Sequence, residues 1–522
     1  MNAILKGFMV ILLFTFLSRI LGLGRDASIA HLYGATSTTD AFLIAYNIPF
    51  FFYDIIGISL VTIIVPIFSR YMIKDCKNEA WILISLIINI VAVITILMII
   101  IGIICLPVLV NTMVGGFKPE TIQLAIELIS ILLPSIFFMS MIGIFTGILN
   151  SHNIFGPPAM GPAIMNLLII ISTFTASKWF GIHGLALGTL VGTILYLIIQ
   201  FPALRHVNFK YHFYFNIKHP QLRKIGIMLM PLLLATLISE TYILIDWKLA
   251  SNLTEGSIAA LTYADKLVQI PKGLFVFSMA TAIFPTISKL AAGGLKEEMA
   301  LTLQKANKII MLFGIPTSLG LIILREPIVY LLFEHGAFDA HATMMTTKAL
   351  MFLAVGMVGF CLNISLTQAF YALQDMYTPL YVSLVTLGIK ILFSLVLVGY
   401  LYHAGLALAT SITVLIHAII LTLILNKKLT SLFNQDFCYY VLKTILASAA
   451  MGLIVYILDG FILNHYGNGI LNTLVRLSLD ATCGIIIFLA IACLLGIFSF
   501  VHYVKLFITI LKTKLIASNI SE

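Results

Sequence analysis

Stretches of about twenty apolar residues recur along the whole length of this 522-residue chain. A stretch of that length is long enough to cross the hydrocarbon core of a bilayer as a helix. Hydrophobic residues make up 61% of the sequence and charged residues only 10%, whereas a soluble domain carries about 25% charged residues. We therefore expect an all-α polytopic membrane protein.

About fourteen such stretches can be recognised, and the connections between them are too short to hold a soluble domain. The predicted spans lie near residues 4–24, 41–68, 81–107, 124–149, 157–177, 182–204, 225–247, 258–285, 308–333, 346–372, 378–401, 405–426, 438–460 and 472–499.

Three short segments return in the same order at nearly the same offset, which indicates an internal duplication. Gly184-Leu185-Ala186-Leu187-Gly188-Thr189 recurs as Gly405-Leu406-Ala407-Leu408-Ala409-Thr410, at 405 − 184 = 221. The other matches pair Ala41, Ala45, Pro66, Ser69 and Arg70 with Ala260, Ala264, Pro285, Ser288 and Lys289, and Gly147, Asn153 and Pro157 with Ala369, Asp375 and Pro379. Membrane chains built of two similar halves usually hold their binding site between them and work by rocking one against the other, which is typical of transporters.

The repeat predicts the domain organisation. Residues 1–215 form a first six-helix lobe, residues 216–430 a second one, and residues 431–522 two additional helices with a cytoplasmic tail. Because six is even, both lobes enter the membrane with the same orientation. We therefore expect them to be pseudo-symmetric about an axis along the membrane normal.

The basic residues alternate between the two sets of connections. Nineteen of the 30 Lys and Arg residues fall in one set of connections and termini, and only Lys118, Lys178, Lys248 and Arg325 fall in the opposite set. The positive-inside rule then places both termini in the cytoplasm. The net charge of +9 is thereby explained by topology, and we expect no nucleic-acid partner.

Seven basic residues lie within or at the edge of predicted spans, where each costs roughly 2.5–3.5 kcal/mol at a helix centre and needs a partner or a wet cavity. Arg476 and Asp480 are spaced as a local ion pair on one helix. Lys348 and Lys390 can either snorkel from span ends or lie inside. Arg19, Arg25 and Lys266 sit among apolar residues in the first pair of helices of each lobe, so they suit a central cavity that holds a phosphate or diphosphate.

The amino-terminal residues resemble the signature of the MurJ/MviN family, which are lipid II flippases of the multidrug/oligosaccharidyl-lipid/polysaccharide exporter superfamily. The resemblance rests on Ser18-Arg19-Ile20-Leu21-Gly22-Leu23-Gly24-Arg25-Asp26, Tyr33-Gly34-Ala35, Thr39-Asp40-Ala41-Phe42, Ile48-Pro49, Tyr263-Ala264-Asp265-Lys266-Leu267, and Phe370-Tyr371 with Gln374-Asp375 and Thr378-Pro379. It covers about residues 1–430 well. It implies a fourteen-helix protein of the bacterial cytoplasmic membrane that moves lipid II from the cytoplasmic to the outer leaflet by alternating access.

The resemblance also implies site residues. Arg19, Arg25 and Asp40 match the family's cavity charges, and Lys266 stands where the family usually has arginine, so it keeps the charge but loses the bidentate fork. After Ile48-Pro49 many members carry paired basic residues, whereas this chain reads Phe50-Phe51-Phe52-Tyr53-Asp54.

For energy coupling, the sequence has no Walker-type phosphate loop, so we expect no nucleotide and no other cofactor. The resemblance to the family implies that transport is driven by the membrane potential or an ion gradient. Asp246 and Asp375 are candidate cation contacts. We expect no metal site, and a monomer surrounded by membrane lipids.

Three other functions stay open. The missing basic residues favour a flippase for another polyprenyl-diphosphate-linked saccharide. A drug/cation antiporter would want an acid-dominated cavity. A polytopic membrane enzyme would need clustered acids or histidines, and the histidines here are scattered without metal-ligand or acid/base spacing.

Overall fold

The computed structural model describes residues 2–73, 77–216, 218–273, 277–429, 432, 434–466 and 469–497. Regular structure over these residues is helical. In the first half the helices are α1 (Asn2–Tyr33), α2 (Ser37–Phe52), η1 (Tyr53–Ile58), α3 (Ser59–Ile73), α4 (Lys77–Val114), α5 (Pro119–Leu132), α6 (Ser135–Ser151), α7 (Gly156–Phe174), α8 (Ala176–Phe180), α9 (Ile182–Ile198) and α10 (Phe201–His206). In the remainder they are α11 (Pro220–Ala250), α12 (Ser257–Pro271), α13 (Phe277–Ala292), α14 (Lys296–Ile323), α15 (Arg325–Phe333), α16 (Ala340–Val355), α17 (Met357–Ala372), α18 (Tyr377–Lys428), α19 (Gln435–Tyr466) and α20 (Ile470–Leu494).

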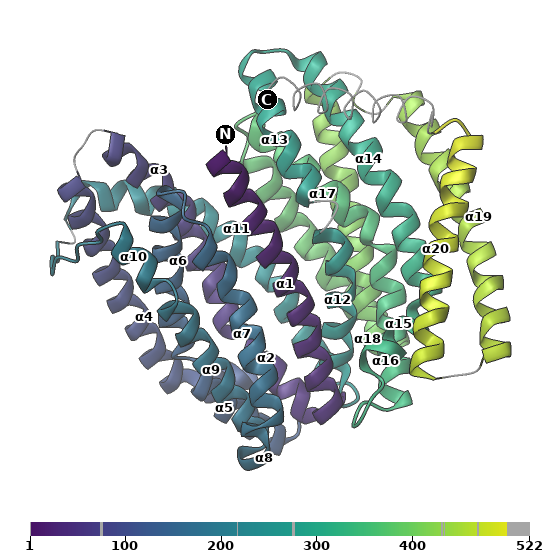
Figure 1. Ribbon diagram of the computed structural model, residues 1–522, viewed down its shortest axis with the longest axis horizontal. Helices are drawn as coiled ribbons and strands as arrows, with labels where there is room; N and C mark the ends of the chain where they lie inside the picture. Colours follow the sequence, from purple (N-terminus) through teal and green to yellow (C-terminus); the bar gives the residue numbers. More distant parts are fainter. Residues whose placement is uncertain are drawn as a thin grey trace, which may run out of the picture. The chain divides into compact units, whose positions relative to one another are not determined.

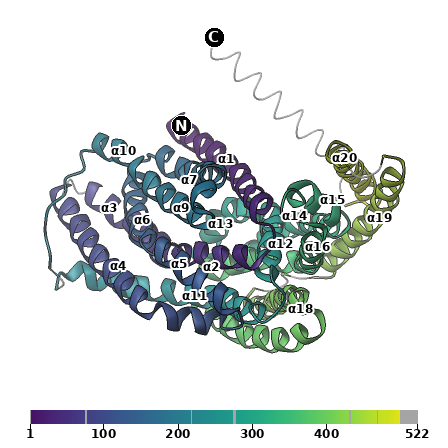
Figure 2. The ribbon, with the colours of Figure 1, turned by 90° about the horizontal axis from the view of Figure 1, so that it is seen from below.

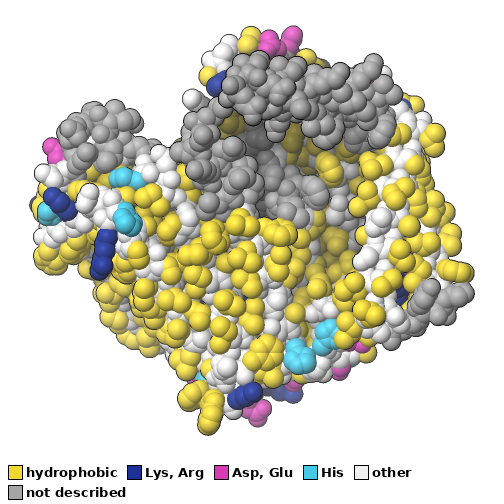
Figure 3. All heavy atoms as spheres, viewed as in Figure 1, with side chains coloured by type: hydrophobic (Ala, Val, Ile, Leu, Met, Phe, Trp, Pro, Cys, Tyr) yellow, Lys and Arg dark blue, Asp and Glu magenta, His cyan; other side chains and the backbone are white. Residues whose placement is uncertain are grey.

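In the part of the chain that the structure describes, the fourteen predicted spans lie mainly on helix, which confirms the predicted fold class. Over the described residues, nine helical stretches are long and apolar enough to cross a membrane, and the bent pair α16 and α17 makes a tenth. The spans near 378–401 and 405–426 form one continuous element, α18, bent at Tyr402. Figure 3 shows a face covered largely by hydrophobic side chains, with charged ones at its margins.

Local sequence explains where several helices begin and change form. Proline occupies one of the first two positions of α5, α7, α10 and α11, where its missing N–H costs nothing. Thr36 caps α2 by accepting a hydrogen bond from the backbone of Thr39. Pro49 interrupts the hydrogen bonds of α2, and the chain continues as the single-turn π-helix η1, a form often found at functional sites.

By its contacts the chain forms two compact units. Unit 1 contains Met1–Lys266, Leu332–Ala349 and Ser383–Ala409, and unit 2 contains Leu267–Leu331, Leu350–Val382 and Thr410–Glu522. Unit 1 therefore combines the first half of the chain with three stretches of the second half. The compact units are defined by contacts, whereas the predicted lobes are defined by the sequence repeat. The units therefore do not test the lobe boundaries, which stay a prediction.

In unit 1, α1 packs along α7, which packs in turn against α9 (Figure 1). Helix α2 packs on α5, and α3 on α6. Helix α11, the first of the second half, contacts α4 (Figure 2). Helices α5 and α7, which are far from α1 and α2 in the sequence, are thereby packed against them.

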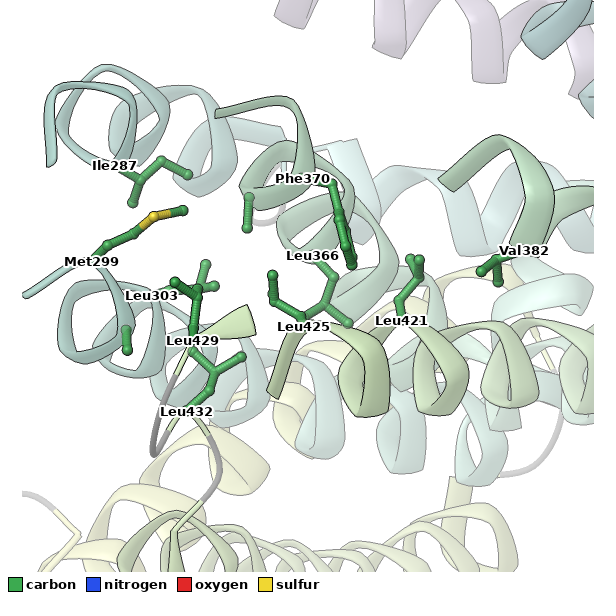
Figure 4. Close-up of a cluster of buried hydrophobic side chains, with 12 residues drawn as sticks. Ile287, Met299, Leu303, Leu366, Phe370, Val382, Leu421, Leu425, Leu429 and Leu432 are labelled. Atoms are coloured by element: carbon green, nitrogen blue, oxygen red, sulfur yellow. The ribbon is translucent and has the colours of Figure 1, made fainter. Parts of the chain in front are cut away.

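In unit 2, α14 packs against α13, α17 and α19, and α20 pairs with α19 (Figure 1). A buried cluster joins α13, α14, α17 and α18, and Figure 4 shows its side chains pointing toward one another. It includes Ile287, Met299, Leu303, Leu366, Phe370, Leu421 and Leu425. Since lipid tails are as apolar as leucine, such a cluster within the membrane is stabilised mainly by close packing.

The sequence repeat has a counterpart in the backbone. Gly181, before α9, has φ 56° and ψ −140°, and Tyr402, within α18, has φ 52° and ψ −134°. The two positions differ by 402 − 181 = 221. Asn153 and Gln374, which follow α6 and α17, have φ 58° and 59° and also differ by 221. The same corners thus occur in both halves.

The repeated hexapeptide starts with a glycine for a packing reason. A methyl group on Gly184 would lie 2.5 Å from the backbone of Ala176, and one on Gly405 would lie 2.2 Å from the backbone of Leu397. Ala176 and Leu397 again differ by 221. The duplication inferred from sequence is therefore present in the three-dimensional contacts.

Candidate functional site

A small pocket lies between α1, α2 and α12, inside unit 1. Its wall contains Arg25 and Lys266, two of the four predicted substrate-binding residues, one from each half of the chain. The other lining residues are Asp26, Ile29, Phe42, Leu43, Tyr46, Asn47 and Thr262. The pocket is therefore lined by charged, hydroxyl and amide side chains together with apolar ones.

Arg25 is held in a fixed orientation at this wall. It is 7% exposed, and its Nε and Nη2 donate to Oδ1 of Asp26 at 2.9 and 2.7 Å. Nη1 donates to Oδ1 of Asn166 at 3.0 Å and to the hydroxyl of Tyr46, whose ring centroid lies 4.8 Å from the guanidinium carbon. These bonds use four of the five N–H groups of the guanidinium. Arg25 and its neighbour Asp26 therefore form a buried ion pair.

Lys266 is half-buried on α12, one turn after Thr262. Its charge acts on Asp54, which lies in the π-helix η1. Asp54 belongs to the segment that departs from the family pattern, so an acid occupies the region where the resemblance implies bases. Asp54 also acts electrostatically on Glu240 of α11. The second cation of the pocket therefore has carboxylates nearby, which reduces the net positive charge.

Asp40 does not line the pocket, and it caps a helix of the other half. It is 1% exposed, and its Oδ2 and Oδ1 accept hydrogen bonds from the backbone N–H groups of Gly256 and Ala259 at 2.8 and 2.7 Å. These are donors at the start of α12, where a carboxylate is favoured. Gly256 has φ 82°, and a methyl group there would lie 2.1 Å from the backbone oxygen of Ala35. Its geometry gives Asp40 a positioning role, and a substrate contact stays a prediction.

Further bonds join the two halves beside Asp40. The N–H of Ala337 donates to the carbonyl of His31 at 2.8 Å. Lys118 and Glu255 form an exposed ion pair at 2.6 Å, and the hydrogen bond from Lys118 lowers the pKa of Glu255. We call these contacts, together with those of Asp40, the inter-half latch.

Arg19 lies six residues before Arg25 on α1, roughly 9 Å along the helix axis. It is exposed and does not line the described pocket. The structure thus brings Arg25 and Lys266 together, and leaves Arg19 and Asp40 outside that wall.

The two candidate ion-coupling residues are both engaged with lysines. Asp246 of α11 lies 2.7 Å from Nζ of Lys390, whose side chain is 0% exposed. Asp375 accepts bonds from the backbone and hydroxyl of Thr378 and from Lys428. Burial raises the pKa of Asp375, but the bonds from Lys428 and Thr378 outweigh it and lower the pKa to about 2. Neither carboxylate is a vacant cation site in this structure.

For the other membrane cations, the structure decides between the two alternatives for Lys390 and shows that the expected partner of Arg476 was wrong. Lys390 does not snorkel, because its ammonium is buried between Asp246 and the carbonyl of Leu406 at 3.2 Å. Arg476 pairs across helices with both carboxylate oxygens of Asp459 on α19, and not along its own helix with Asp480. Interhelical partners of this kind have no regular sequence spacing, so i,i+4 reasoning cannot find them.

Sequence reasoning missed the role of Tyr46 and did not connect Asn166 with Arg25. The signal available for Asn166 is that a lone amide in an apolar helix needs a hydrogen-bonding partner. It also donates to the carbonyl of Ser18 at 3.2 Å, which ties α7 to α1. Tyr46 carried no comparable signal, since tyrosines are frequent in this chain.

Comparison with known proteins identifies relatives over most of the chain. The family described as "Lipid II flippase MurJ" matches residues 29–477. A "Probable lipid II flippase MurJ" of Buchnera aphidicola (Acyrthosiphon pisum) is 30% identical over 87% of this chain and 90% of its own length. The "Lipid II flippase MurJ" of Burkholderia cenocepacia is 27% identical over 80% and 82%.

Solved structures agree with this placement. The structure titled "Lipid II flippase MurJ, inward closed conformation" has a TM-score of 0.80 and 28% identity, covering 93% of this chain and 98% of that one. An inward-facing multidrug resistance MATE family transporter has a TM-score of 0.69 at 17% identity, which shows a shared fold alone. From its family match and its fold, this chain belongs to the lipid II flippase MurJ family.

Proposed function

We propose that this protein is a lipid II flippase, which moves an undecaprenyl-diphosphate-linked peptidoglycan precursor from the cytoplasmic to the outer leaflet by alternating access. The observation that carries the proposal is the pocket that joins Arg25 of the first half to Lys266 of the second. Membership of the MurJ family supplies the substrate class. The protein is accordingly a transporter and not an enzyme.

The pocket suits the part of the substrate that resists crossing. A diphosphate bearing sugars is strongly disfavoured in hydrocarbon. Arg25 offers a positive charge held in place by Asp26, Asn166 and Tyr46, and Lys266 offers a compact mobile charge. Two cations from different halves can hold the diphosphate while the protein closes toward one side of the membrane and opens toward the other.

The inter-half latch gives a physical basis for alternating access. It consists of a few hydrogen bonds and one exposed ion pair, so its contribution is small enough to be reversed by substrate binding. We infer that Asp40 stabilises the state in which α2 caps α12, and that this contact separates when the protein opens on that side.

For energy coupling we propose the membrane potential or an ion gradient, with no nucleotide or other cofactor. The absence of a Walker-type loop from the sequence supports this. Coupling through Asp246 or Asp375 requires exchange of a lysine for the coupled ion, because each carboxylate has a lysine partner in this structure. We further propose a monomer in the bacterial cytoplasmic membrane with both termini in the cytoplasm, which the distribution of basic residues supports.

The test is depletion of the protein in cells that lack a second flippase. Lipid II is expected to accumulate on the inner leaflet, and its exposure at the outer surface is expected to fall. Unchanged surface exposure contradicts the lipid II assignment. If surface exposure of a different polyprenyl-diphosphate saccharide falls instead, the second candidate, favoured by Asp54 in place of a base, replaces the first.

A further inference from the structure

The connection between α10 and α11 lies against α4 in an irregular, extended conformation (Figures 1 and 2). Three hydrogen bonds hold it there. The N–H of His212 donates to Oγ of Ser85 at 3.0 Å, Nδ2 of Asn89 donates to the carbonyl of Tyr214 at 3.0 Å, and the hydroxyl of Tyr211 donates to Oδ1 of Asn89 at 2.5 Å. Ser85 and Asn89, two polar residues on the very apolar α4, thus hold residues 211–215 of the connection in place. We call these residues the pinned segment.

The pinned segment presents aromatic side chains outward. Tyr211 is 50% exposed, Phe213 87% and Phe215 49%. In an extended chain successive side chains point to opposite faces, so side chains two residues apart, like these three, point to the same face. Large exposed aromatic groups in a row are unfavourable in water and need a surface to contact.

The length of α4 sets the depth of this segment. Its apolar stretch Asn78–Val114 has 37 residues, about 55 Å of helix, whereas the hydrocarbon core is about 30 Å thick. If both ends project equally, about 12 Å extends beyond the core at each end. Ser85 and Asn89 lie roughly 10 and 16 Å from Asn78, which places the pinned segment at the boundary between the headgroups and the hydrocarbon core.

Two further features fit that level. Irregular backbone is not tolerated against lipid tails, because its peptide groups need water or headgroups as partners. Trp81, one turn before Ser85, packs edge-on against Phe209 with 5.4 Å between ring centroids, and tryptophan is enriched at membrane interfaces.

The charges of the connection have one sign. Residues 201–220 contain no Asp or Glu, and they carry Arg205, His206, Lys210, His212, Lys218 and His219. Figure 3 shows Lys, Arg and His side chains gathered at the left edge, where Figure 1 places this connection. Exposed cations beside exposed aromatic groups complement the negative surface of anionic lipids.

We propose that residues 205–216, together with Lys218, form an interfacial anchor that binds the headgroups of anionic phospholipids. Lys210, Lys218 and Arg205 contact the phosphates, and Phe213 and Phe215 insert at the boundary between headgroups and tails. Because the anchor joins the two halves of the repeat, it ties their junction to the surface of one leaflet.

The first experiment measures contact directly. Phe213→Trp is placed in a chain whose three tryptophans are replaced by phenylalanine, and the protein is reconstituted in nanodiscs. Dibrominated phosphatidylglycerol is expected to quench this tryptophan more strongly than dibrominated phosphatidylethanolamine at equal mole fraction. Lys210→Ala with Lys218→Ala is expected to reduce that preference by about fivefold or more, whereas the matched pair Lys178→Ala with Lys296→Ala leaves it unchanged.

A second experiment does not depend on replacing Trp81. Native mass spectrometry of the otherwise unmodified chain is expected to show retained anionic lipid that is lost in Lys210→Ala/Lys218→Ala. Equal quenching by both lipids, or equal lipid retention by the two chains, overturns headgroup binding. Quenching by aqueous iodide alone places the segment in water, and protection from both quenchers indicates a protein partner; either result overturns the proposal.

Discussion

In each half of the chain a charged side chain joins the first predicted helix to the fifth, and the two contacts have opposite arrangements. In the first half Arg25 of α1 bonds to Asn166 of α7 and to its neighbour Asp26. In the second half Asp246 of α11 pairs with Lys390 of α18. The cation is on the first helix in one case and on the fifth in the other. Arg25 lines the pocket, whereas Lys390 is completely buried.

The difference shows how a duplicated scaffold can divide its tasks. A polar contact at this place ties two helices together in both halves. Only the first half uses it to orient a cation at the pocket, and the second half supplies its pocket cation from α12, as Lys266. Lys390 is therefore a structural cation, even though its surroundings in the sequence are as apolar as those of Arg25.

The largest expected effect comes from Lys390→Met. Removing one partner of a buried pair leaves an uncompensated charge and costs about 3–5 kcal/mol. We expect the folded, monodisperse fraction in detergent to fall sharply, as measured by fluorescence-detected size exclusion after heating. The double variant Lys390→Met/Asp246→Asn is expected to recover most of the loss. A single variant as stable as the original would mean that the pair is not structural.

Arg25→Lys tests the other side of the comparison. The charge is kept, but the bonds to Tyr46 and Asn166 through a planar fork are lost, and bonds to charged groups contribute about 1.5–3 kcal/mol each. We expect lipid II translocation in proteoliposomes to fall about tenfold or more while the folded fraction changes little. Normal transport by Arg25→Lys would show that its geometry is unimportant.

Asp40→Ala is expected to have an intermediate effect on the inter-half latch. Loss of a cap costs about 0.5–2 kcal/mol. The state in which α2 contacts α12 should therefore be depopulated severalfold. The measurement is cross-linking of Lys118→Cys to Glu255→Cys with a short bismaleimide, which spans the gap left by two long side chains whose tips lie 2.6 Å apart. The same cross-linking yield with and without Asp40 would exclude its role in the latch.

The smallest effect concerns the repeated corner. Tyr402 has a backbone conformation that favours glycine and is 61% exposed, so Tyr402→Gly removes strain with little loss of packing. We expect it to be stabilising by about 1 kcal/mol, whereas Gly181→Ala is destabilising by a similar amount. Chemical denaturation of the purified variants measures both, and equal signs would contradict the equivalence of the corners.

Much of the fold follows from the sequence, because apolar length alone decides where helices can cross a bilayer. The repeat is visible in the sequence because Gly184 and Gly405 lie too close to the backbone of Ala176 and Leu397, respectively, for either position to carry a side chain. Arg25 and Lys266 could be singled out because a cation in an apolar run requires an explanation.

The partners of these cations could not be predicted in the same way. Asp246 and Lys390 are far apart in the sequence, and only the packing of α11 on α18 brings them together. Asp40 was expected to be a cavity charge because it matches the family's cavity charges, whereas its carboxylate reaches the start of α12 in the other half. Depth and neighbours, which decide whether a charge binds substrate or supports the structure, are properties of the assembled helices.

The central claim is that Arg25 and Lys266, from different halves, together hold the diphosphate of lipid II. Its most direct test is translocation of lipid II by reconstituted Lys266→Gln and Lys266→Arg proteins with equal folded fractions. We predict that Lys266→Gln loses transport and that Lys266→Arg retains it. Transport by Lys266→Gln at the rate of the unmodified protein would contradict the claim.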